Sequence, residues 1–137
     1  MNKPFQVYEL KKIDTPKFVM SPIELKDYID FEIKRFYYIT NPTEESGQHC
    51  HYQEKEFFVL IQGTCTAVID QGNGKEEFPM QGPSSALYVP NYVWHGFTNF
   101  SKDAILLAAT STNYNPDRSD YLEDYDAYLK IRDEHLK

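Results

Sequence analysis

The sequence predicts an all-β fold, a small sandwich or barrel of short strands followed by one short C-terminal helix. Short apolar or alternating segments recur along the chain, with Gly, Pro and Asn turn signals between them. Aromatic residues make up 15% of the 137 residues, which favours strands and an aromatic-lined cavity over a helix bundle. Only the last segment spaces its apolar residues as a helix does.

The expected strands follow one another from the N-terminus. The run FEIKRFYYIT (Phe31–Thr40) alternates, so that every second side chain shares one face. That face carries Ile33, Arg35, Tyr37 and Ile39. A tight turn at residues 62–64 and the run Gln71-Gly72-Asn73-Gly74 each predict a hairpin. The expected strands are Phe5–Leu10, Phe18–Met20, Phe31–Thr40, Gln48–His51, Glu56–Gln62, Cys65–Asp70, Glu76–Met80, Ser85–Val89, His95–Asn99 and Ala104–Ala109.

The helix is expected over Asp120–Leu136, where the helical spacing of Tyr121, Tyr125, Leu129 and Arg132 gives one shared face. We find no internal repeat, low-complexity stretch or linker. The sequence therefore predicts a single domain that spans residues 1–137.

Composition excludes some classes of function. The net charge of -7 and the pI near 5.0 argue against a protein that binds a nucleic acid polymer along a basic face, but not against a nucleotide ligand. No apolar run approaches the roughly 18 residues of a membrane span, and MNKPFQVYEL lacks the apolar core of a signal peptide. Two cysteines without a C-x-x-C motif fit reduced thiols. We therefore expect a cytoplasmic protein without a membrane partner.

Three of the four histidines stand in two polar motifs. Alternation along a strand places His49 and His51 on one face, with side chains about 6–7 Å apart. Glu56 can join them if the chain turns through residues 52–55, and His95 follows in a later segment. Such a cluster suits either a metal site or proton transfer, and residue types alone leave both open.

These two segments resemble the two motifs of the cupin superfamily. The first reads H-x-H-x4-E-x6-G from His49 to Gly63, and the second reads P-x4-H-x3-N from Pro90 to Asn99. Tyr92 stands where the second motif usually has glycine. The resemblance implies a small cupin (jelly-roll) barrel in which the histidines and the glutamate converge on the interior.

A closer resemblance covers nearly the whole chain. The runs IKRFYYI (Ile33–Ile39), LYVPNYVWH (Leu87–His95) and YNPDRSDYLEDYD (Tyr114–Asp126) resemble the dTDP-sugar 3,4-ketoisomerases of the WxcM-like cupins. The resemblance implies a sugar-nucleotide isomerase that converts dTDP-4-keto-6-deoxyglucose to a 3-keto sugar through an enediolate, with no cofactor. It implies that the product supplies the biosynthesis of 3-amino-3,6-dideoxy sugars for surface glycans. It also implies a homodimer that exchanges N-terminal strands.

The same resemblance implies roles for individual residues. His49 falls on the catalytic base, and Tyr37 falls on the tyrosine that lines the sugar site. His51 and His95 would polarise or position the sugar oxygens, and Glu56 would hydrogen-bond one of these two histidines. Strand alternation adds Arg35 to the cavity face, which suits the diphosphate. Tyr88 and Trp94 are candidates for stacking on thymine or sugar, against ordinary core packing.

Two departures from the family pattern matter. Ser46 stands where the ketoisomerases usually carry arginine, which puts one ligand contact in doubt. Glu56 stands where they commonly carry glutamine, and it completes a metal-ligand set of His49, His51, Glu56 and His95. A metal-dependent cupin enzyme is therefore the alternative prediction, and a non-catalytic sugar-binding cupin is a third.

Overall fold

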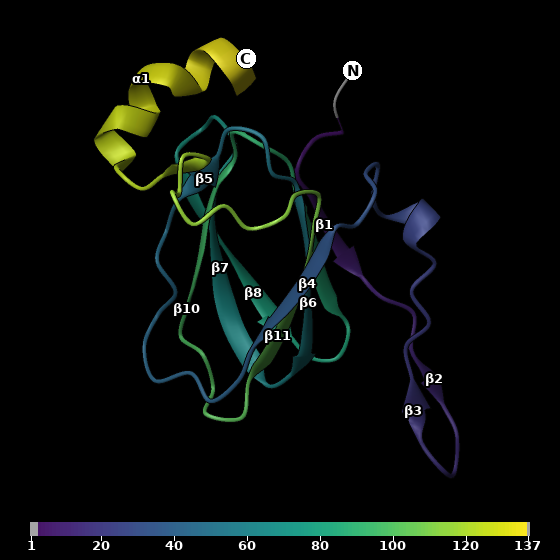
Figure 1. The fold of residues 1–137 in the computed structure, drawn as a ribbon. Coiled ribbons are helices and arrows are strands. Elements are labelled where there is room, and N and C mark those ends of the chain that lie inside the picture. Colours follow the sequence, from purple (N-terminus) through teal and green to yellow (C-terminus); the bar gives the residue numbers. More distant parts are fainter. Residues whose placement is uncertain (1–2, 137) are drawn as a thin grey trace.

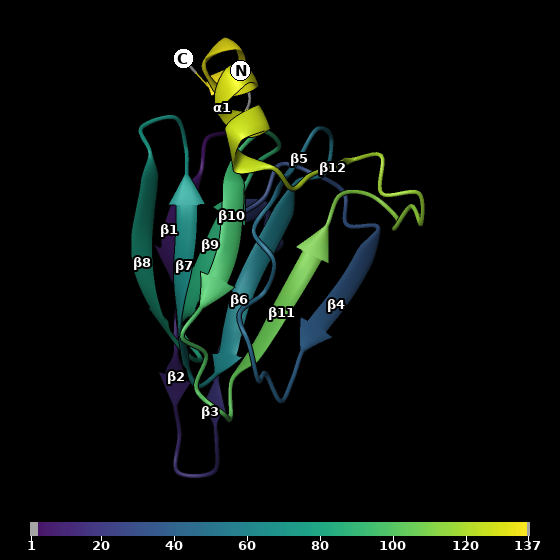
Figure 2. The same ribbon diagram turned by 90° about the vertical axis from the view of Figure 1, so that its left-hand side faces the viewer.

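The computed structural model describes residues 3–136, and two antiparallel sheets that face each other form its body (Figures 1 and 2). The larger sheet has the strand order β1-β9-β6-β11-β4. Its strands are β1 (Gln6–Glu9), β4 (Arg35–Ile39), β6 (Glu56–Gln62), β9 (Ser85–Val89) and β11 (Ile105–Thr110).

The second sheet has the order β10-β7-β8, and a short ribbon extends it. Its strands are β7 (Thr64–Asp70), β8 (Lys75–Gln81) and β10 (Trp94–Thr98). An isolated bridge between His49 and His95 joins β10 to the ribbon of β5 (Cys50–His51) and β12 (Tyr121–Leu122). The architecture is consistent with the expected jelly roll, although the sheets are not hydrogen-bonded into a closed barrel.

Strand alternation gives the larger sheet two buried faces. One face packs against the second sheet, and its side chains include Phe58, Leu60, Leu87 and Leu106. The other face carries Phe57, Val59, Ala86 and Tyr88, and the segment of residues 23–33, with its 3-10 turn η1 (Leu25–Asp27), covers it. The cavity described below therefore lies on the first of these faces.

The N-terminal region differs from the expectation in its details. Phe18–Met20 contributes only β3 (Val19–Met20), which pairs with an unexpected strand, β2 (Ile13–Asp14). This hairpin projects from the body of the protein (Figures 1 and 2). Phe18, at its turn, is 57% exposed.

The expected start of the C-terminal helix was wrong. Helix α1 spans Tyr125–Leu136, because the Asp124 carboxylate accepts the first free N–H groups, from Asp126 at 2.9 Å and Ala127 at 3.3 Å. Tyr121 belongs to β12 instead of the helix. The helix packs Tyr128 against Trp94 and Cys50, and the Tyr128 hydroxyl donates to the carbonyl of Tyr92 at 2.7 Å.

Most strand predictions are confirmed within two residues of their ends. Glu56–Gln62 and Ser85–Val89 match residue for residue, whereas Phe31–Thr40 shortens to β4 and Gln48–His51 to β5. Among residues 3–136, no helix is long and apolar enough to span a bilayer.

Candidate active site

Strand pairing brings the two histidine motifs to one inner face. His49 lies opposite His95 in the isolated bridge, and His51 lies opposite Tyr121 in the β5–β12 pair. Side chains directly opposite each other in an antiparallel pair share a face, so all four point inward. Cys50, between the two histidines, points the other way, into the cluster under α1, as alternation along a strand requires.

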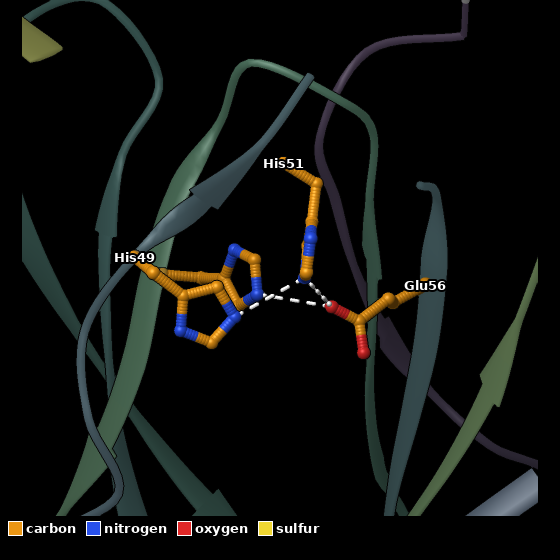
Figure 3. Close-up of side chains that lie close together, drawn as sticks. His49, His51 and Glu56 are labelled. Carbon is orange, nitrogen blue, oxygen red and sulfur yellow. Dashed lines mark hydrogen bonds and ion pairs between the residues drawn. The ribbon is translucent and has the colours of Figure 1, made fainter. Parts of the chain in front are cut away.

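Glu56, the first residue of β6, is the centre of the cluster. Its Oε1 atom lies 3.0 Å from His51 Nε2 and 3.1 Å from His95 Nε2, and Figure 3 shows His49, His51 and Glu56 converging. Its Oε2 atom accepts the Tyr37 hydroxyl at 2.8 Å. The expected bond from a histidine to Glu56 is confirmed twice. Burial opposes ionisation of Glu56, but these donors outweigh it and hold its pKa well below the usual range.

Tyr37 reaches Glu56 across a strand. In the order β6-β11-β4, Tyr37 lies opposite Ala108, whose small side chain leaves room for the ring to lean toward β6. Burial, and then the facing Glu56 carboxylate, raise the pKa of Tyr37 well above its usual value. The phenol therefore stays protonated and remains a hydrogen-bond donor.

His49 has the properties of a neutral base. Its Nδ1 atom lies 3.2 Å from the Gly47 carbonyl oxygen, which can only accept, so Nδ1 carries the proton and Nε2 has the lone pair. Burial, and then the charges of His95 and His51, lower the pKa of His49 to about 3. Its Nε2 atom lies 3.1 Å from His51 Nε2.

His51 lies among three carboxylates, which favour its protonated form. Its Nε2 atom is within 3.1 Å of Glu54 Oε2 and 3.0 Å of Glu56 Oε1. Its Nδ1 atom lies 3.3 Å from Asp120 Oδ2, a distance that suits an ion pair although the angle does not suit a hydrogen bond. Burial opposes protonation, but the bond to Glu56 and the nearby carboxylates outweigh it and raise the pKa of His51.

A second buried carboxylate, Glu54, was not foreseen from the sequence. It accepts Arg35 Nη2 at 3.0 Å and the Thr112 hydroxyl at 2.7 Å, and only 4% of its side chain is exposed. Burial, and then the charge of Glu56, raise its pKa. The spacing of Glu54 and Glu56, two residues apart, was the available signal, since period two places both on one face of an extended chain.

A cavity of about 380 Å³ opens beside these groups. It exposes His49, His95 and Tyr37 to a ligand, together with Arg35, which lies on the face that alternation predicted. The remaining lining residues are Ile39, Ser46, Gly47, Phe58, Gly96, Phe97, Leu106, Arg118, Tyr121 and Glu123.

Two aromatic candidates lie outside the cavity. Tyr88 was expected near thymine or sugar, but it is fully buried on the other face of the larger sheet and donates to Asp30 at 2.5 Å. Alternation along β9 explains the error, because Leu87 and Val89 take the inward positions. Trp94 is buried under α1 and donates to Gln48 at 3.0 Å. Of its two expected roles, the structure therefore shows core packing.

The loop before His49 is tied to β10. The Ser46 hydroxyl accepts the Phe97 N–H at 3.0 Å, so Ser46 orders the loop that lines the cavity. Gly96 permits the close approach of this loop, since a Cβ atom at that position would lie 2.3 Å from Gln48 Cγ.

The tail supplies residues that local sequence patterns did not identify. Tyr121 packs against His49 and His51, with ring centroids 5.0 and 4.6 Å apart, and Arg118 stacks on Tyr121 at 3.9 Å. Asp120 accepts the backbone N–H groups of residues 53 and 54 at 2.7 and 3.1 Å. Asp120 and Tyr121 had been assigned to the C-terminal helix, in which their contacts do not form.

The cluster can serve two kinds of chemistry. A neutral imidazole beside an imidazolium and a protonated phenol is suited to moving a proton and stabilising an oxyanion. The same donor set, His49, His51, Glu56 and His95, offers ligand atoms that all lie within 4.8 Å of one another, which fits a divalent metal ion.

Comparisons with known proteins agree on one family. The family model described as FdtA, WxcM-like, C-terminal, matches residues 3–133. A curated TDP-4-oxo-6-deoxy-α-D-glucose-3,4-oxoisomerase from Aneurinibacillus thermoaerophilus is 35% identical, and the match covers 91% of this chain and 90% of the relative.

Solved structures extend the likeness to the fold. A TDP-quinovose 3,4-ketoisomerase from Campylobacter jejuni is 27% identical, with a TM-score of 0.82 over 94% of this chain and 99% of the other. A histidine-to-asparagine mutant of the 3,4-ketoisomerase QdtA from Thermoanaerobacterium thermosaccharolyticum, in complex with TDP-4-keto-6-deoxyglucose, is 25% identical, with a TM-score of 0.85 over 99% of both chains.

Proposed function

The chain belongs to the FdtA family of WxcM-like C-terminal domains, and from this premise we propose that it is a dTDP-sugar 3,4-ketoisomerase. Its substrate is dTDP-4-keto-6-deoxyglucose, the class of sugar nucleotide that its relatives act on or bind. The observation that carries the proposal is the neutral His49 imidazole in the cavity wall, beside a cationic His51 and the Tyr37 phenol.

The reaction moves protons and leaves the atom and electron count unchanged. The C4 ketone acidifies the proton on C3, and His49 Nε2 removes it to give an enediolate. A proton returned to C4 and exchange of the hydroxyl proton from O3 to O4 complete the shift of the ketone to C3. Because His49 starts neutral and its Nδ1 atom is tied to Gly47, the same Nε2 atom can accept the proton and return it.

The other groups act on the developing negative charge. Glu56 and Glu54 favour the protonated form of His51, which lies behind the cavity wall with its Nε2 atom 3.1 Å from His49 Nε2, so its charge would act on an enediolate through this neighbour. Tyr37 lines the cavity and donates its proton to Glu56, and a turn of the hydroxyl would offer the same proton to a sugar oxygen. His95, which is hydrogen-bonded to Glu56 and to the carbonyl of Val93, lines the cavity and would position the sugar.

The test is the reaction itself in heavy water. Purified protein incubated with dTDP-4-keto-6-deoxyglucose should give a 3-keto product with deuterium at C4, read by NMR, and the recovered substrate should carry deuterium at C3. An added 3-aminotransferase should trap the product as a 3-amino-3,6-dideoxy sugar. Absence of both isotope exchange and 3-keto product would refute the proposal.

A metal-dependent enzyme is the second candidate, and the clustered donor set favours it. His49, His51, Glu56 and His95 would hold the ion, and Zn, Fe, Mn and Ni all suit such ligands. When bound, the ion would supply Lewis-acid polarisation of a substrate oxygen. Elemental analysis of protein purified without a His tag tests this candidate, which requires about one equivalent of transition metal per chain.

We also propose a cytoplasmic homodimer in which the N-terminal segments are exchanged between chains. The β2–β3 hairpin supports this assembly, because it projects from the body (Figure 1) and its apolar side chains Phe18, Val19 and Met20 are exposed. Cys50 and Cys65 are unpaired, as a reducing compartment requires. Light scattering that gives a monomer at micromolar concentration would reject the dimer.

A further inference from the structure

Two arginines, Arg35 and Arg118, line the cavity, and they differ in how firmly they are held. A nucleoside diphosphate needs a cation near its phosphates, and the guanidinium fork suits phosphate oxygens. Either arginine could supply this contact by its charge alone. Their existing partners decide which one is available.

Arg35 is committed to the protein. Its Nη2 atom donates to Glu54 at 3.0 Å and its Nε atom donates to Thr110 Oγ1 at 3.3 Å. Glu54 is buried and lies beside Glu56, so loss of Arg35 would leave two neighbouring buried carboxylates with less compensating charge. Separating a buried ion pair is far more costly than separating an exposed one. Arg35 therefore stays with Glu54 when a ligand binds.

Arg118 is available to a ligand. Its charged partner is Glu123, whose Oε1 atom lies 2.6 Å from Nη2, and both side chains are about half exposed, at 46% and 59%. The exposed Tyr114 is a further, uncharged neighbour. An exposed pair of this kind contributes little and exchanges readily with another anion. The stack on Tyr121 at 3.9 Å keeps the guanidinium over the cavity wall while its N–H groups change partner.

We propose that Arg118 is the exchangeable anion contact of this site. It leaves Glu123 for the diphosphate of the nucleotide sugar and remains stacked on Tyr121, while Arg35 stays paired with Glu54. The inference rests on the proposed function, which supplies the diphosphate. It has a consequence for Glu123, because that carboxylate competes with the ligand for the same guanidinium and its removal should strengthen binding.

Calorimetric titration of TDP, and of thymidine as a ligand without phosphate, tests the exchange. Arg118→Ala should weaken TDP binding by about 10-fold or more, the loss of one charge-assisted contact, and should leave thymidine binding nearly unchanged. Arg118→Lys should keep part of the affinity, since it retains charge without the fork. Glu123→Gln should tighten TDP binding severalfold. Lys102→Ala, which removes an exposed charge from the loop before β11, is the matched control and should change neither titration.

Each failure has a separate meaning. Wild-type protein that does not bind TDP would overturn the proposed function and, with it, this inference. Wild-type protein that binds TDP while Arg118→Ala binds it equally well would overturn the inference alone. Weaker TDP binding by Glu123→Gln would overturn it too, since Glu123 would then be assisting the ligand. Thermal unfolding midpoints near that of the wild type would establish that the variants are folded.

Discussion

Two buried carboxylates, Glu56 behind the cavity wall and Asp70 beneath α1, show how similar burial serves different ends. Asp70 accepts the Gly72 N–H at 2.8 Å, the Tyr125 hydroxyl at 2.7 Å and Arg132 Nη1 at 3.0 Å. These donors keep their protons at neutral pH. Glu56 instead accepts from a phenol and two imidazoles, and imidazole is the side chain that changes charge near neutral pH.

The difference separates a structural anchor from a reactive site. Asp70, at the end of β7, holds the first and second turns of α1 through Tyr125 and Arg132, so its bonds fix where the helix lies. Glu56 holds groups whose protons can move. Changes at Asp70 should therefore alter stability, and changes around Glu56 should alter turnover.

The largest expected effect is on stability. Asp70→Ala leaves the Gly72 N–H without its buried acceptor and Arg132 with only its exposed partner Asp133, and unsatisfied buried donors of this kind cost up to about 3 kcal/mol of unfolding free energy. Urea unfolding measures the loss. The exposed Asp14→Ala is the control and should change stability by no more than about 0.5 kcal/mol. A small loss in Asp70→Ala, or a kcat that falls with the protein still folded, would remove the distinction between the two carboxylates.

The next effect is on turnover. His49→Asn should lower kcat by about 10²-fold or more, the usual contribution of a general base, and should leave the unfolding free energy and TDP affinity nearly intact. His135→Asn, on the exposed end of α1, is the matched control and should keep full activity. Near-wild-type turnover by His49→Asn would move the search for the base to His51 or His95.

A smaller loss of turnover is expected from Tyr37→Phe. Glu56 keeps its two imidazole partners in this variant, so the cluster persists while one proton donor toward the sugar is lost. We expect kcat to fall about 10-fold, less than the 10²-fold or more of a full acid–base contribution, because the phenol is a supporting donor. Steady-state kinetics beside His49→Asn gives the ranking. A loss in Tyr37→Phe that exceeds the loss in His49→Asn would make the phenol, instead of the imidazole, the principal group.

The loss of unfolding free energy at acid pH should depend on Asp70. Burial opposes its ionisation, but the Gly72 N–H, Tyr125 and Arg132 outweigh burial and lower its pKa. A lowered folded-state pKa stabilises the fold above the unfolded value of about 3.9, and this stabilisation is lost as pH falls through the folded value. The stability difference between wild type and Asp70→Asn should therefore shrink below about pH 4. Urea unfolding at pH 6 and below pH 4 measures it, and a constant difference would contradict the assignment.

The sequence was informative wherever one local pattern decided the outcome. Alternation placed Arg35 and Tyr37 on the cavity face, and strand spacing aligned His49 with His51. The failures depended on contacts between distant segments. The apolar residues of β9 suit either face of the sheet, so the sequence could not tell which face Tyr88 takes. Tyr88 is buried on the face away from the second sheet, because the segment of residues 23–33 covers that face.

The predicted start of the C-terminal helix was wrong for a related reason. The segment before α1 carries a helix-like spacing, yet Asp120 bonds the turn after His51 and Asp124 caps the helix one turn later than expected. The long-range bonds of Asp120 override the helical spacing of its own segment, and the local cap at Asp124 then sets where the helix begins. They also bring Tyr121 and Arg118 to the cavity, which no periodicity within the tail could indicate.

The smallest expected effect is that of chelation. Each of the four candidate ligands already has a polar partner within the cluster, and Tyr37 and the carbonyls of Gly47 and Val93 add further hydrogen bonds, so the cluster holds together on its own donors and acceptors. An ion on His49 would also occupy the Nε2 lone pair, and a ligated nitrogen cannot accept the C3 proton. If His49 is the base, exhaustive chelation and repurification should therefore leave kcat within about twofold, measured with dTDP-4-keto-6-deoxyglucose and compared with His49→Asn. Loss of activity on chelation, with recovery when about one equivalent of a transition metal is returned, would assign Glu56 and the histidines to a metal centre instead of a proton-transfer site.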